Sequence, residues 1–179
     1  MATLLTYSGT PANSTRIGDA LSNTYQAQQF TATTSGTLTS LKYFERIFDG
    51  SPTDGLRFQI WTDSSDSPGS LITGATKDIA HADIVNGGNS WDISESTTVT
   101  FATPPNITNA SKYWVVIKRQ GSVDATNYYN PWVTSPSSYA GGIQRSGDAT
   151  PNWTTLNQDM VLEITITNVV DGSAFLAFM

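Results

Sequence analysis

A run of aromatic and amide side chains between Asn127 and Gly142 is the part of this sequence best suited to bind a ligand. The stretch, NYYNPWVTSPSSYAGG, holds four rings among amide groups, and a guanidinium group follows it. Sugar rings present C–H faces that stack on aromatic rings, while polar side chains nearby make the hydrogen bonds. We therefore predict a glycan platform with these members: Asn127, Tyr128, Tyr129, Asn130, Trp132, Tyr139 and Arg145. The alternative is that the rings cap the open end of a sandwich, since large aromatic side chains are more often packed than displayed.

Two carboxylates three residues apart, in the run DSSDSPG from Asp63 to Gly69, are candidates for a cation site. Carboxylate and hydroxyl oxygens are the hard ligands that Ca²⁺ takes. The run lacks the spacing of an EF-hand loop and has no bidentate Glu nearby, so we interpret it as a polar turn. The sequence predicts neither a metal site nor a cofactor.

The carboxylates and the single histidine do not form a recognisable catalytic arrangement. Glycoside hydrolysis needs two carboxyl groups facing each other across the scissile bond, whereas Glu45, Glu95 and Glu163 fall on separate segments. His81 has no cysteine or second histidine with which to form a triad or a zinc site. We expect no catalytic residues and no enzyme activity.

The composition is that of a folded, acidic domain. Of 179 residues, 38% are hydrophobic, 11% aromatic and only 13% charged, and the net charge is −6 with a pI near 4.4. A backbone of phosphates needs a basic face, and the nine Lys and Arg residues never form a run, which argues against nucleic acid and against an anionic membrane surface. No segment has the apolar length of a transmembrane helix, so membrane insertion is not expected.

Alternating side chains predict strands along most of the chain. In DMVLEITIT, Met160, Leu162, Ile164 and Ile166 share one face, and the residues between them share the other. In LRFQIWT, the apolar side chains of residues 56, 58 and 60 oppose Arg57, Gln59 and Trp61. KYWVVIKR, residues 112–119, is apolar on both faces, which predicts a central strand covered on each side.

About eight such strands, separated by turns every 8–12 residues or so, predict an all-β antiparallel sandwich of jelly-roll type. We expect an N-terminal arm or edge segment over 1–24, the sandwich over 25–168 and an apolar C-terminal tail over 169–179. GTLTSLKYFERIF is expected to be one strand, residues 77–93 to be irregular, and residues 121–153 to be a long aromatic loop region with a short hairpin.

The order of these blocks resembles a known type of β-sandwich module over residues 25–167. The blocks are QAQQFTA, GTLTSLKYF, LRFQIWTDSSDSPGSLI, SWDI with TTVTFATPP, NASKYWVVIKR, YAGGIQRSGDATPNW and DMVLEITI. Similar jelly-roll modules occur in bacteriophage virion proteins and as carbohydrate-binding-like repeats of secreted bacterial proteins. The resemblance implies the fold, and it carries no catalytic residue with it.

We expect a non-enzymatic structural or attachment protein of a virus particle, such as a capsid decoration or a tail or fibre component. The surface is rich in Ser, Thr and Asn, cysteine is absent, and the first residues have no signal-peptide pattern. The expected location is the virion, with an extracellular location, as a carbohydrate-binding module of a secreted bacterial protein, as the alternative. The expected partners are other virion proteins and a surface glycan, and the protein is expected to be a homo-oligomer or present in many copies. The candidate docking residues are Leu4, Leu5, Phe175, Leu176, Phe178 and Met179.

Overall fold

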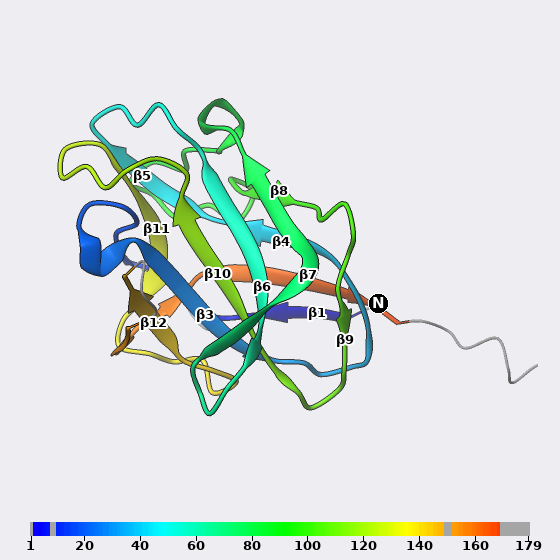
Figure 1. The fold of residues 1–179 in the computed structure, drawn as a ribbon. Coiled ribbons are helices and arrows are strands. Elements are labelled where there is room, and N and C mark those ends of the chain that lie inside the picture. The colour runs from blue at the N-terminus through cyan, green and yellow to red at the C-terminus, as the bar shows by residue number, and fades with distance from the viewer. Residues whose placement is uncertain (1, 8–9, 149–151, 169–179) are drawn as a thin grey trace, which may run out of the picture.

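Segments with alternating apolar side chains form antiparallel strands in the computed structural model, which describes residues 2–7, 10–148 and 152–168 (Figure 1). The strands are β1 (Ala2–Leu5), β2 (Asn13–Ser14), β3 (Tyr25–Thr31), β4 (Gly36–Tyr43), β5 (Glu45–Asp49), β6 (Leu56–Asp63), β7 (Pro68–Ile79), β8 (Thr97–Val99), β9 (Asn106–Ile107), β10 (Lys112–Arg119), β11 (Tyr128–Thr134), β12 (Gln144–Gly147), β13 (Trp153–Leu156), β14 (Asp159–Met160) and β15 (Leu162–Thr167). Two short 3-10 helices, η1 (Leu21–Asn23) and η2 (His81–Asp83), complete the described part.

The strands form two larger sheets and one smaller sheet. The six-stranded sheet has the order β13-β12-β3-β10-β6-β7. The five-stranded sheet has the order β1-β15-β4-β8, with β9 also paired to β4. The smaller sheet is centred on β11, which pairs with β14, β2 and β5. In Figure 1, β3, β10, β6 and β7 cross in front of β1 and β4. The predicted all-β class is confirmed, and the jelly-roll strand order remains a prediction.

The main core lies between the two larger sheets. Phe58 and Ile60 from β6 and Val115 from β10 meet Leu41 and Ile164 from the opposite sheet, and all five side chains are fully buried. Burying a side chain of this size stabilises the folded state by about 1.5–3 kcal/mol, because its apolar surface is removed from water. The faces predicted for LRFQIWT and DMVLEITIT are therefore confirmed.

Strand β10 is the central strand that its sequence predicts. It pairs with β3 on one edge and with β6 on the other. Val115 and Ile117 face the main core, whereas Trp114 and Val116 face the other side of the sheet and are also buried. Something must therefore cover that second side, and this covering layer forms the candidate site below.

The N-terminal segment is part of the sheets. Strand β1 pairs with β15 along its whole length, so it forms the edge of the five-stranded sheet. Strand β2 pairs with β11, and Ile17 is completely buried. Turn residues hide this role in the sequence, because Pro11 and Gly18 interrupt the alternation that marks a strand.

Three expectations about element boundaries are wrong. The expected single strand over residues 36–48 is split between β4 and β5, which lie in different sheets on either side of the buried Phe44. The region 121–153 contains the long strand β11 as well as the β12–β13 hairpin. The described residues form fifteen strands, many of only two to four residues, where about eight were expected.

Candidate functional site

The aromatic residues predicted to form a glycan platform lie on a buried strand. Strand β11 has partners along both edges, and all seven of its residues are buried. Tyr129 is fully enclosed, Trp132 is 3% exposed and Tyr128 8% exposed. An irregularity between Asn130 and Pro131 disguises the strand in the sequence. The expected loop is wrong, and these rings have no free face on which a sugar could stack.

The other predicted platform residues are dispersed. Asn130 is buried, and its Nδ2 donates to the Ile47 carbonyl oxygen at 3.1 Å. Asn127 accepts a hydrogen bond from the Ser51 N–H at 2.7 Å and so ties two loops together. Tyr139 is half-buried against the main core. Arg145 alone lies on an accessible sheet face, on β12.

The predicted docking residues are only partly within the described chain. Leu4 is half-buried and packs against the main core, whereas Leu5 is 41% exposed. The candidates at positions 175, 176, 178 and 179 lie outside the described residues. The docking role stays a prediction.

The side of the six-stranded sheet that points away from the main core is the surface we call the outer face. In the register of the sheet, Trp114 lies opposite both Gln29 and Trp61, and directly opposite residues share a face. The register assigns these members to the outer face: Tyr25, Ala27, Gln29, Arg57, Gln59, Trp61, Thr76, Asp78, Trp114, Val116, Lys118, Arg145, Trp153 and Thr155.

Three aromatic rings cover the centre of the outer face. Trp114 is fully buried, and the half-exposed rings of Tyr25, Trp61 and Trp153 pack against the cluster that it forms with its neighbours. A half-exposed ring has one face fixed by packing and part of its surface open to solvent. This arrangement gives the outer face a fixed aromatic surface of the kind predicted for the loop region around residues 127–142.

A glycine sets the position of Trp153. Gly147 lies directly opposite Trp153 in the β12–β13 hairpin, and a Cβ atom at Gly147 would lie 2.7 Å from Cε3 of the indole ring. The ring can therefore lie over the strand only because no side chain is present there. The indole ring also contacts Tyr25 in an edge-to-face arrangement, with ring centres 6.0 Å apart.

Polar side chains surround the rings on the β6–β7 side. The Trp61 indole N–H donates to Gln59 Oε1 at 3.3 Å, and Gln59 Nε2 donates to Thr76 Oγ1 at 3.4 Å. Arg57 binds both carboxylate oxygens of Asp78 at 2.7 Å, a bidentate pair that holds the guanidinium group in the plane of the carboxylate. This border offers fixed donors and acceptors beside the rings.

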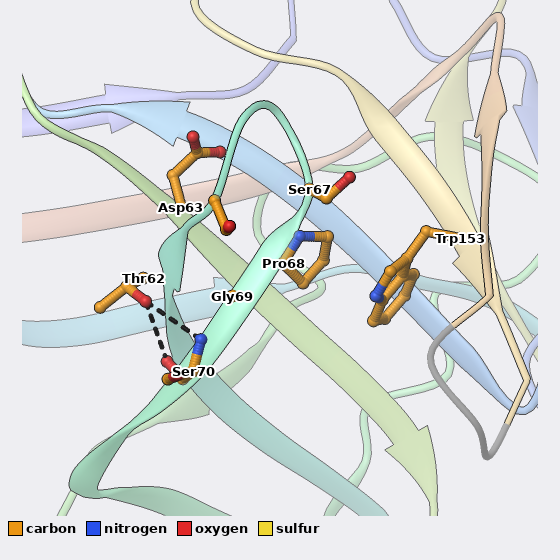
Figure 2. A pocket seen from close by; sticks show the side chains of 8 residues that line it. Thr62, Asp63, Ser67, Pro68, Gly69, Ser70 and Trp153 are labelled. Atoms are coloured by element: carbon orange, nitrogen blue, oxygen red, sulfur yellow. Dashed lines mark hydrogen bonds between the residues drawn. The ribbon is translucent and has the colours of Figure 1, made fainter.

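An open cleft of about 590 Å³ lies between the β6–β7 hairpin and Trp153. Figure 2 shows the Trp153 ring across from Pro68, with the Ser67 hydroxyl group beside them. Thr62 Oγ1 accepts from the Ser70 N–H at 3.0 Å and donates to the Ser70 carbonyl oxygen at 3.3 Å, which closes the hairpin (Figure 2). The cleft is thus walled by one indole ring on one side and by hydroxyl and backbone groups on the other.

The turn that follows β6 is fixed to the sheet by its aspartates. Asp63 Oδ1 accepts hydrogen bonds from the Trp114 indole N–H and from Gln29 Nε2, both at 2.7 Å. Lys112 donates to Asp66 at 2.5 Å, and this bond lowers the pKa of the Asp66 carboxyl. Both carboxylates are therefore engaged by N–H donors, which supports the interpretation of this run as a polar turn.

The sequence contained a signal for this site. The alternation in LRFQIWT already places Trp61 on the face opposite the core residues, together with Arg57 and Gln59. What the sequence does not show is that Tyr25 and Trp153, which lie 128 positions apart, reach the same surface through β3 and β13. Pairing between distant strands decides which rings are displayed and which are packed.

The Glu45 carboxyl has a strongly raised pKa, and its side chain is fully buried. Burial raises its pKa from 4.5 to about 8, although hydrogen bonds from Tyr43 and Asn130 act in the opposite direction. A raised carboxyl pKa is often a mark of an active site. This carboxyl is fully enclosed and cannot meet a substrate, so we interpret it as a structural group of the core.

His81 lies in η2 and packs against two aromatic rings. Its ring centre is 4.7 Å from that of Phe48, and its Nδ1 lies 3.0 Å from the Tyr129 hydroxyl group. Within the described ranges, no three His, Cys, Asp or Glu side chains are grouped so that they could hold a metal ion. No helix of the described part is long and apolar enough to cross a membrane.

No protein-family model matches this chain, and no curated protein matches it.

Proposed function

We propose that this protein is a non-catalytic glycan-binding module and that the outer face is its binding surface. The observation that carries the proposal is the gathering of Tyr25, Trp61 and Trp153 on one rigid sheet face, each half-exposed and each fixed by packing. Sugar C–H groups stack on aromatic faces. Because these rings are already fixed by packing, binding costs little side-chain entropy.

The shape and chemistry of the surface favour a polysaccharide over a compact small molecule. The cleft is open, and its lining is mainly hydroxyl and backbone groups with one indole ring. Small-molecule sites are usually enclosed and mostly apolar. Sugars instead offer hydroxyl groups along their whole length, which suit the amide and hydroxyl groups of Gln59, Thr76 and Ser67.

We place this binding in the attachment apparatus of a virus particle, with a secreted carbohydrate-binding protein as the alternative setting. The acidic, cysteine-free, Ser- and Thr-rich composition and the resemblance to sandwich modules of virion and secreted proteins support both settings. Immunodetection of the protein in purified particles distinguishes the two settings, since the secreted alternative predicts that particles lack it.

The proposal is tested by measuring the affinity for a panel of soluble neutral and acidic polysaccharides in retardation gels and by titration calorimetry. We expect Trp61→Ala and Trp153→Ala each to lower the affinity about tenfold or more, because a buried aromatic contact at the centre of an interface is worth roughly 1.4 kcal/mol or more. The matched control is Trp91→Ala, which removes a half-exposed indole ring that packs away from the outer face, against Phe44 and Trp132.

The proposal is contradicted if no polysaccharide binds to the native protein. It is equally contradicted if Trp91→Ala abolishes binding while the two outer-face variants bind normally. The melting temperature of each variant shows whether it is folded, so that a loss of binding can be assigned to the missing ring.

A further inference from the structure

Two basic side chains on the outer face, Lys118 and Arg145, have no ion-pair partner in the part of the chain that the structure describes. Lys118 Nζ lies 5.5 Å from the centre of the Tyr25 ring, and this cation–π contact holds the ammonium group at the surface. Arg145 is half-buried, and its Nε has no hydrogen-bond acceptor. The same is true of the Trp153 indole N–H in the neighbouring strand. Both N–H groups are enclosed in the protein and have no hydrogen-bond partner among the described residues.

The carboxylates on or beside the outer face are already occupied by donors. Asp78 is bound by Arg57, and the charge of Lys118 acts on it only as a smaller, longer-range effect. The remaining carboxylates and their donors are Asp66 with Lys112, Asp63 with Gln29 and Trp114, and Asp148 with Asn152. The charge of Arg145 acts on Asp66 only as the weakest of the effects that lower its pKa. Among the described residues, neither Lys118 nor Arg145 forms an ion pair on this face.

The register places the two cations on either side of β3, the strand that carries Tyr25. Lys118 lies opposite Tyr25, and Arg145 lies opposite Ala27, two residues further along the same strand β3. Two strand spacings and two residues put their Cα atoms about 12 Å apart. Tyr25 lies between them, so a chain bound across the ring passes both cations.

We propose that the outer face selects a negatively charged glycan whose sugars carry carboxylate groups. This inference rests on the proposed function and names the class of ligand. Lys118 and Arg145 bind carboxylates of the bound chain while Tyr25 and Trp153 stack on its rings. A guanidinium group fits a carboxylate with two parallel hydrogen bonds, and an ammonium group attracts the same charge. The net charge of −6 makes the chain as a whole repel such a ligand, so binding must depend on these local cations.

The test compares three uronate-containing polysaccharides, namely polygalacturonate, alginate and hyaluronate, with their methyl-esterified, uncharged forms. We expect at least one charged form to bind about tenfold or more tightly than its ester. Lys118→Gln and Arg145→Gln should each lower the affinity for the charged form about tenfold and leave that for the ester unchanged. Lys77→Gln is the matched control, because Lys77 lies on the same sheet opposite Phe58, a residue of the inner face.

Each outcome decides the matter. If charged and esterified chains bind equally and the Lys118 and Arg145 variants bind as the native protein does, the inference fails while glycan binding itself stands. If Lys77→Gln has the same effect as the two variants, net charge and not this site is responsible, and the inference also fails. If neither the uronate-containing polysaccharides, their esters nor neutral polysaccharides bind, both the inference and the proposed function are overturned.

Discussion

Glu45 carries a carboxyl group that is fully enclosed in the protein, and its protonation couples folding to pH. The group has a pKa of 4.5 as an ordinary exposed glutamate and about 8 in the folded protein, because burial disfavours the charged form. Between these values the folded chain holds a proton that the unfolded chain has lost. This contribution to stability is fully present below about pH 4.5 and is lost as the pH rises through 8.

We predict that the free energy of unfolding falls as the pH rises from 5 to 8, by at most about 1.4 kcal/mol per pH unit from this group. Glu45→Gln keeps the size of the side chain and removes the titration, so its stability should change much less over the same range. Urea unfolding at several pH values measures both slopes. The half-exposed Glu95, changed to Gln, is the control and should keep the native slope. Equal slopes for the native protein and Glu45→Gln would contradict this assignment.

At the scale of elements, Thr6 joins the N-terminal segment to the strand that closes the domain. Its hydroxyl group donates to the Met160 carbonyl oxygen at 2.5 Å and accepts from the Leu162 N–H at 2.9 Å. Its own N–H donates to the Leu162 carbonyl oxygen at 3.1 Å. Thr6 is fully buried, so the segment before residue 25 contributes directly to the sandwich.

Replacing Thr6 by Val, which has nearly the same shape, should therefore destabilise the protein by about 1–3 kcal/mol, because the Leu162 N–H and the Met160 carbonyl lose a partner in a site closed to water. Thr3→Val on the exposed side of β1 should change stability by no more than about 0.5 kcal/mol. Urea unfolding of the two variants measures the difference. If both variants were as stable as the native protein, the N-terminal segment would be a dispensable arm.

At the scale of the whole molecule, local alternation was enough to predict the class and the main strands. The core residues of β6, β10 and β15 lie on the predicted faces because a buried strand must alternate or be apolar throughout. The candidate site was harder to predict because exposure depends on which strands pair. Tyr129 and Trp153 are both aromatic residues with polar neighbours in the sequence. Tyr129 is nevertheless buried, because β11 has partner strands on both edges, whereas the Trp153 ring on β13 lies on an open face.

The claim at the centre of this account is that the outer face of the six-stranded sheet binds a glycan. The five tryptophans make it directly testable, because each indole N–H gives its own NMR signal and the rings occupy different surfaces. When a binding polysaccharide is titrated in, we predict that the signals of Trp61 and Trp153 move while those of Trp91 and Trp132 stay in place. Movement confined to Trp91 and Trp132 would contradict the account.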